Sequence, residues 1–336
     1  MSSLTLSTNM IVLFSFETLS NSFYLTVMQK GKKLNYLKND LLMIKMLEGI
    51  FVPHVTPFDE EEKINRDILT ELIQYFEDVG ITGFVTLGSN GEFPYLNLSE
   101  KLDVLEIVRN STKKPVIAGV TENSTKETLE LARKAWDIGV DALLIAPPFY
   151  FKPRDSEIFA HYSLIAGKID APVIIYNVPK FTGINIGLEI IERLVYEHSN
   201  IMGIKDSSGS IGRIVELIRR VGNEIAVLAG TADVILPALL LGASGAVVAI
   251  ANVAPRLCVE LYNAFTEMKL ERAKKLQILI NQLNEVLVKK LNQVSAIKEA
   301  MNMRGLAVGY PRMPSLPLSE NEVREVERVL IETGLL

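Results

Sequence analysis

From Gly49 onward, short apolar runs alternate with amphipathic stretches along the chain. Eight of the runs are rich in valine and isoleucine and nearly continuous in hydrophobicity, which is typical of parallel strands buried on both faces. They cover residues 50–55, 83–87, 115–119, 141–146, 172–177, 201–205, 225–229 and 245–250. This pattern predicts eight buried strands.

The stretches between the runs have apolar residues at helical spacing. In residues 66–79, for example, Leu69, Ile73 and Phe76 share one face. Further helices are predicted at 99–111, 124–138, 156–168 and 210–221, and Ser99 and Ser124 are the expected N-caps. Eight strand–helix units over about two hundred residues predict an α/β fold, the TIM (β/α)8 barrel. A doubly wound sheet is the competing fold, but it carries a glycine-rich turn after its first strand, which this chain lacks.

The chain is expected to have three parts. Residues 46–255 form the barrel, and residues 256–336 hold the last barrel helix and a C-terminal helical cap with helices near 270–291, 296–303 and 320–332. Residues 1–45 are an extension without arginine, whose first lysine is Lys30, so they fit neither a signal peptide nor a transit peptide. We expect a poorly structured extension or a start codon placed too far upstream, with Met43 or Met46 as the true start.

Composition narrows the function classes. The net charge is -5 and no basic run is present, which argues against nucleic-acid binding. The longest apolar runs are too short to span a bilayer, and the single Cys258 excludes an intramolecular disulfide, so we expect a cytoplasmic protein. The histidines His54, His161 and His198 have no zinc-site spacing, and no P-loop or dinucleotide fingerprint is present. We therefore expect no metal and no organic cofactor.

A lysine ends the sixth predicted strand, and catalytic residues of barrels lie at the carboxyl ends of strands. Alternation places Ile201, Gly203 and Lys205 on one face of this strand. A buried lysine is rare. Burial favours the neutral amine, which can attack a carbonyl carbon and form a Schiff base. The alternative is a lysine that reaches solvent or pairs with Asp206.

Three other strand ends carry candidate groups. Tyr176 ends the fifth strand, where its phenol can relay protons, although a core tyrosine is the alternative. After the second strand, the loop 88–92 reads GSNGE; its glycines permit a tight turn whose N–H groups can hold a carboxylate, and Ser89 adds a hydroxyl. A plain turn that caps a helix is the alternative there. Tyr150 lies in a proline-stiffened loop after the fourth strand, where the alternative is an aromatic interaction surface.

Taken together, these segments resemble the dihydrodipicolinate synthase / N-acetylneuraminate lyase family of class I aldolases over roughly residues 46–336. The resemblance rests on VTPF at 55–58, GSNGE at 88–92, YNVP at 176–179, GIKD at 203–206, AG at 229–230 and ANV at 251–253. The order of six such segments at strand ends makes the match specific, although each segment is modest alone.

The resemblance implies a role for each candidate. Lys205 matches the Schiff-base lysine, Tyr176 the tyrosine that shuttles the proton, and Ser89 the hydroxyl of the proton relay. Tyr150 matches a second relay tyrosine, which reaches in from a neighbouring subunit. The resemblance therefore also implies a homo-oligomer, a tetramer built as a dimer of dimers.

It further implies the substrate-binding positions. Backbone groups of Ser89 and Asn90 would hold the carboxylate of pyruvate, a 2-oxo acid, while Gly230 and Val247 would line the pocket. Phe181 stands where the synthases of the family usually carry an arginine that binds the carboxylate of aspartate semialdehyde. A phenyl ring cannot replace a guanidinium, and the adjacent Lys180 is expected to point in a different direction.

The segment GSNGEFP at 88–94 and the KDS at 205–207 look closest to the 4-hydroxy-2-oxoglutarate aldolase branch. Our leading hypothesis is thus reversible aldol cleavage of a 4-hydroxy-2-oxo acid to pyruvate and an aldehyde, with small molecules as the only substrates. The alternatives are 4-hydroxy-tetrahydrodipicolinate synthase, a 2-keto-3-deoxy sugar-acid aldolase, and a non-catalytic barrel that binds a 2-oxo acid.

Overall fold

The computed structural model describes residues 10–12, 27–29 and 45–336. Residues 10–12 and 27–29 form the strands β1 (Met10–Val12) and β2 (Val27–Gln29), which pair in an antiparallel manner. Most of the predicted N-terminal extension, and with it the expected start at Met43, lies outside the described residues.

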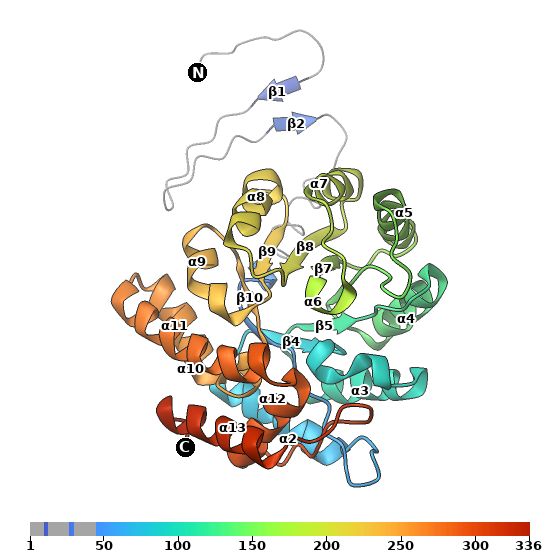
Figure 1. The fold of residues 1–336 in the computed structure, drawn as a ribbon. Helices are drawn as coiled ribbons and strands as arrows, with labels where there is room; N and C mark the ends of the chain where they lie inside the picture. The colour runs from blue at the N-terminus through green and yellow to red at the C-terminus, as the bar shows by residue number, and fades with distance from the viewer. Residues whose placement is uncertain (1–9, 13–26, 30–44) are drawn as a thin grey trace. The chain divides into compact units, whose positions relative to one another are not determined.

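Eight parallel strands close into a barrel, in which each strand pairs with its neighbours in chain order and the last pairs with the first (Figure 1). They are β3 (Gly49–Val52), β4 (Gly83–Thr86), β5 (Val116–Gly119), β6 (Ala142–Ile145), β7 (Val173–Asn177), β8 (Ile201–Asp206), β9 (Ala226–Ala229) and β10 (Gly245–Val247). Each falls within one residue of a predicted run at its start. The predicted (β/α)8 barrel is confirmed.

Helices surround the barrel (Figure 1). They are α2 (Arg66–Val79), α3 (Leu98–Ser111), α4 (Thr125–Ile138), α5 (Asp155–Ala166), the short α6 (Pro179–Thr182), α7 (Leu188–Glu197), α8 (Ile211–Val221), α9 (Ile235–Leu240) and α10 (Pro255–Thr266). Ser124 caps α4 as predicted. The predicted cap at Ser99 is wrong, because Asn97 begins α3 with a capping box in which its side chain and that of Glu100 each accept the other residue's backbone N–H.

The strands divide their side chains between two apolar layers. Ile174 and Tyr176 of β7 belong to the cluster inside the barrel, whereas Ile175 packs between strands and helices. On β8 the alternation is interrupted, because the pairing with β7 shifts register after Val173. Ile201 therefore packs in the outer layer, and our prediction that it shares the face of Lys205 is wrong.

The C-terminal segments form further helices, drawn in orange and red in Figure 1. They are α11 (Leu270–Asn284), the π-helical segment η5 (Glu285–Lys290), α12 (Gln293–Met303) and α13 (Glu320–Glu332). The three predicted helices are present, but the π-helical turn was not predicted. Side chains of α12 contact the loop after β4, so this cap reaches the carboxyl ends of the strands. In the part of the chain that the structure describes, no helix has both the length and the apolar character that a membrane span requires.

Candidate active site

Two neighbouring cavities lie at the carboxyl ends of the strands, with volumes of about 60 and about 250 Å³. Seven of the eight predicted site residues line the smaller one: Lys205, Tyr176, Ser89, Asn90, Gly230, Val247 and Phe181. Ser89, Tyr176 and Phe181 also line the larger cavity, so the two spaces share a wall. The predicted residues, which are scattered over the whole barrel sequence, thus meet at one place.

Lys205 and Tyr176 lie side by side on adjacent strands. They are direct partners in the register of β7 and β8, and the Nζ of Lys205 lies 4.1 Å from the centroid of the Tyr176 ring. Lys205 is 4% exposed, and the carboxylate of Asp206 pairs with Arg213. Both alternatives for Lys205, exposure to solvent and a pair with Asp206, therefore disagree with the structure.

Ser89 connects this pair to the loop after β4. Its Oγ lies 3.4 Å from the Oη of Tyr176, a long hydrogen bond. Catalytic hydrogen bonds are often long in the absence of substrate and shorten when it binds. The residue begins a single 3₁₀ turn, η1 (Ser89–Gly91), and Glu92 after it has the left-handed φ of 57°. The two hydroxyls can therefore pass a proton between them at the wall of the cavity that Lys205 also lines.

A buried polar cluster lies behind the two catalytic candidates. Oδ2 of Asp206 accepts hydrogen bonds from Nε of Arg213 at 2.7 Å and from Nδ2 of Asn177 at 2.8 Å. Because side chains alternate along a strand, these groups point away from the cavity while Lys205 and Tyr176 point into it. The sequence analysis did not predict this cluster. A usable signal was present, because a polar residue, Asn177 or Asp206, directly follows each of the two catalytic candidates.

The part of the cavity formed by Lys180 and Phe181 differs from our expectation. Phe181 is about half exposed and lines both cavities, and Lys180 lines the smaller one with it, although we expected the two to diverge. The amine of Lys180 donates to the carbonyl oxygen of Val288 at 2.7 Å and to Oε1 of Gln293 at 3.1 Å. Partial burial lowers the pKa of Lys180, an effect that nearby Tyr176 opposes. Sequence reasoning did not find Gln293, whose amide also donates to Oδ1 of Asn90 at 2.7 Å.

Tyr150 is the one predicted site residue that the structure does not bring to the cavities. Its side chain is 78% exposed and stacks edge-on against Phe151, with ring centroids 5.2 Å apart. Its contribution to a neighbouring subunit stays a prediction.

A (β/α)8 barrel with a buried lysine next to a tyrosine at the strand ends defines the class of lysine-dependent aldolases. A family model described as the dihydrodipicolinate synthetase family matches residues 46–333, and the chain belongs to this family. It is 37% identical to a 4-hydroxy-tetrahydrodipicolinate synthase of Archaeoglobus fulgidus, over 87% of this chain and 100% of that protein. A synthase of Methanopyrus kandleri is 36% identical over 86% and 97% of the two chains.

Solved structures agree. A dihydrodipicolinate synthase of Bacillus anthracis superposes with a TM-score of 0.82 and 33% identity, over 85% of this chain and 98% of that chain. YagE, a prophage protein of the same family from E. coli K12 in complex with pyruvate, gives a TM-score of 0.83 and 28% identity, over 86% and 99% of the two chains. Another neighbour is described as a monomeric synthase variant. The expected tetramer therefore stays a prediction.

These findings confirm the predicted family and the enzyme class. Members of the family are pyruvate-dependent lyases and synthases, which hold pyruvate as a Schiff base on a lysine and use no metal cofactor. The resemblance to the 4-hydroxy-2-oxoglutarate aldolase branch gains no support, because the relatives at 33–37% identity are named synthases.

Proposed function

We propose that the protein is a 4-hydroxy-tetrahydrodipicolinate synthase, which joins pyruvate, held on Lys205, to aspartate semialdehyde. The observation that carries the proposal is the buried amine of Lys205 next to the Tyr176 ring at the wall of a cavity. The choice of aldehyde is supported by relatives of 36–37% identity that bear this activity's name.

The reaction begins when the neutral amine of Lys205 attacks C2 of pyruvate. Tyr176 gives a proton as water leaves, and the resulting protonated imine withdraws electrons so that the Tyr176 phenolate can take a methyl proton and an enamine forms. The enamine carbon attacks the aldehyde carbon of the second substrate, and Tyr176 gives a proton to the aldehyde oxygen. The substrate amine then attacks the imine carbon, closes the ring and releases Lys205. The substrate ammonium loses a proton before it attacks, and the Ser89 hydroxyl, next to Tyr176, relays this proton to the phenolate.

The start of the loop after β4 suits the pyruvate carboxylate. The N–H groups of Gly91 and Glu92 donate within the turn, to the carbonyl oxygens of Gly88 and Ser89. The N–H groups of Ser89 and Asn90 have no such acceptor within the described part of the chain. Two consecutive amides of this kind can bind a carboxylate.

The wall near Lys180 suits the carboxylate of aspartate semialdehyde. Two lysines, Lys180 and Lys205, line the smaller cavity, and none of its described lining residues is acidic. The partners of the Lys180 amine are neutral oxygens, which leaves its charge available to an anionic substrate. In this proposal Lys180 binds the carboxylate of aspartate semialdehyde, which the uncharged ring of Phe181 cannot do.

Aldol cleavage of a 4-hydroxy-2-oxo acid, our first hypothesis, is the second candidate. It uses the same imine on Lys205 in the reverse direction. Phe181 favours it, because this ring lines both cavities and offers no positive charge to the carboxylate of aspartate semialdehyde.

The test begins with intact mass spectrometry after incubation with pyruvate and borohydride, which reduces an imine to a stable amine. We expect a pyruvate-sized adduct on the wild type and none on Lys205→Ala, with Lys101→Met as a lysine control that keeps the adduct. Turnover is then compared between aspartate semialdehyde with pyruvate and 4-hydroxy-2-oxoglutarate alone. Faster turnover of the second substrate would move the aldolase to first place, and no adduct on folded wild type would leave only the non-catalytic barrel.

A further inference from the structure

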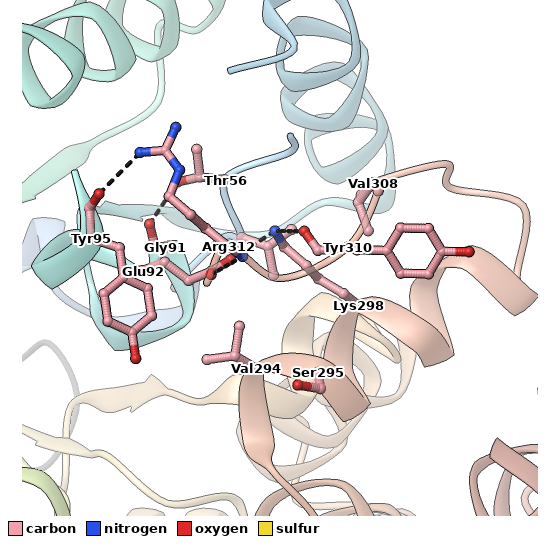
Figure 2. A network of polar contacts seen from close by, with 12 residues as sticks. Thr56, Gly91, Glu92, Tyr95, Val294, Ser295, Lys298, Val308, Tyr310 and Arg312 are labelled. Atoms are coloured by element: carbon pink, nitrogen blue, oxygen red, sulfur yellow. Dashed lines mark hydrogen bonds and ion pairs between the residues drawn. The ribbon is translucent and has the colours of Figure 1, made fainter. Parts of the chain in front are cut away.

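Glu92 closes the turn that carries Ser89 and Asn90, and its side chain is fully buried. Its Oε1 lies 2.7 Å from the Nζ of Lys298 on α12, and the side chain of Lys298 is 1% exposed. Figure 2 shows the two side chains meeting between the loop and the C-terminal helices. The pair therefore joins a loop of the barrel to a segment that follows the barrel in sequence.

Further bonds extend the pair into a network. Oε2 of Glu92 accepts the backbone N–H of Arg312 at 2.8 Å, and Lys298 donates to the carbonyl oxygen of Tyr310 at 2.9 Å (Figure 2). The cationic groups of Lys298 and Arg312 lie 4.2 and 4.3 Å from the centroid of the Phe58 ring. The Glu92 carboxylate is thus bound by two segments of the C-terminal region, one that carries Lys298 and one that carries Arg312.

Each of the three residues after Ser89 is bound by a side chain from outside the turn. The amide of Gln293 on α12 donates to Asn90, Thr56 Oγ1 donates to the carbonyl oxygen of Gly91 at 2.7 Å, and Lys298 pairs with Glu92. Two of the three ties come from α12. The position of this helix therefore fixes the position of the turn.

Stability alone is a poor reason for such a pair. Removing two charges from water is costly, and apolar residues of similar size often stabilise a protein as well as a buried ion pair or better. Burial raises the pKa of Glu92 and lowers that of Lys298 to about 8, in each case against the effect of the partner. The pair lies next to the turn whose residues Ser89 and Asn90 line the smaller cavity, where precise placement of the backbone has a use.

We propose that the Glu92–Lys298 pair is a positioning device that holds the N–H groups of Ser89 and Asn90 where they bind the carboxylate of the 2-oxo acid. Glu92 and Lys298 are positioning residues, because they act through the turn rather than on the substrate's reacting atoms. The inference rests on the proposed function, since it assumes that pyruvate binds at these amides.

The test separates placement from stability with a double variant. Lys298→Met leaves a buried carboxylate unpaired, so both the melting temperature and the affinity for pyruvate should fall. The double variant Glu92→Leu with Lys298→Met has no unpaired charge, so its melting temperature should recover toward that of the wild type. We expect its KM for pyruvate to stay raised about tenfold, the effect of weakening a hydrogen bond to a charged group, while saturating pyruvate still gives the borohydride adduct.

Arg109→Met is the matched control. Arg109 pairs with Asp141 at 2.8 Å beside the amino end of β6, away from the turn. We expect a lower melting temperature with an unchanged KM. Gln293→Leu removes a tie to the same turn without leaving a charge, and should raise the KM severalfold even if the double variant does not fold.

A wild-type KM in the folded double variant, or in Gln293→Leu if the double variant does not fold, would overturn the positioning role. An absent adduct on the wild type would instead refute the proposed function. The two failures are therefore distinguishable.

Discussion

Two buried ion pairs flank the candidate site, and they differ in what they connect. Asp206 and Arg213 are 7 residues apart, on β8 and at the start of α8, and Asp206 also accepts a hydrogen bond from Asn177 at the end of the neighbouring strand β7. Glu92 and Lys298 come from the second strand–helix unit and from the C-terminal helices. The first pair lies directly behind Lys205 and Tyr176, the proposed catalytic residues, and the second lies behind the amides that we propose bind the substrate.

This difference predicts a division of labour. Asn177 and Asp206 follow Tyr176 and Lys205 by one residue, so their bond fixes the distance between phenol and amine. Disturbing it should mainly lower kcat. Disturbing the distant pair should mainly raise KM, because it moves a loop while the strands keep their register.

The largest fall in kcat is expected from a change at Tyr176 itself, and the other variants near the strand ends can be compared with it. Tyr176→Phe keeps the ring against Lys205 but removes the hydroxyl that we propose gives and takes the proton. We expect kcat to fall by about 10² to 10⁴, while borohydride still traps the pyruvate imine. The measurement is steady-state kinetics beside intact mass spectrometry. A variant with wild-type kcat would remove Tyr176 from the mechanism.

Asp206→Ala tests the first ion pair. It leaves the Arg213 guanidinium and the Asn177 amide without their acceptor in a buried place. We expect a loss of about 3–5 kcal/mol in the free energy of unfolding and a fall in kcat of about a hundredfold, an order-of-magnitude loss for a small misplacement of catalytic groups. Urea unfolding and kinetics give both numbers. If the KM for pyruvate changes and kcat does not, the proposed division between the two pairs is wrong.

Lys180→Met tests the proposed binding site for the carboxylate of aspartate semialdehyde. Losing a hydrogen bond to a charged group costs about 1.5–3 kcal/mol, so the KM for aspartate semialdehyde should rise about tenfold or more. The KM for pyruvate should stay the same. Lys289→Met is the matched control, because Lys289 is already paired with Asp233 at 3.0 Å. Equal effects in the two variants would show that Lys180 has no special role.

The comparison also shows what sequence alone can predict. Continuous valine and isoleucine runs mark buried parallel strands, and alternation then places Tyr176 and Lys205 inside the barrel. Periodicity carries no information on partners distant in sequence, so the pairing of Glu92 with Lys298 was not predictable. Nor was the register shift that turns Ile201 outward, since an irregularity in pairing depends on the neighbouring strand.

The other wrong predictions, on the cap at Ser99 and on the direction of Lys180, depend on interactions between residues that are close in sequence. Ser99 is a good capping residue, but Asn97 two positions earlier forms a complete capping box with Glu100, and this longer helix is the one that forms. Lys180 was expected to point in a different direction from Phe181, but the directions of two successive residues in the one-turn helix α6 depend on how that turn sits on the barrel. The chemistry of the site was therefore easier to predict than its substrate contacts.

The smallest effect on catalysis, with a clear effect on stability, is expected at His54. Its ring is buried below the loop after β4, with Nε2 3.0 Å from Thr86 Oγ1 and Nδ1 2.9 Å from the carbonyl oxygen of Val55. Burial lowers the pKa of His54 from 6.5 to about 4, against the effect of the bond to Val55. The unfolded chain therefore binds the proton more readily, so the stability is fully present above pH 6.5 and is lost as the pH falls toward 4.

For His54 this loss is on the order of 3 kcal/mol. His161 has a similarly lowered pKa of about 4 and makes a second contribution of the same sign. Urea unfolding of His54→Gln from pH 7 to pH 4 should show a shallower loss than the wild type, and His161→Gln should do the same. Because neither ring lines the cavities, kcat at pH 7 should stay near that of the wild type. If His54→Gln instead raises the KM for pyruvate as the double variant of Glu92 and Lys298 does, the barrel beneath the turn shares in placing it, and the C-terminal helices are not its main support.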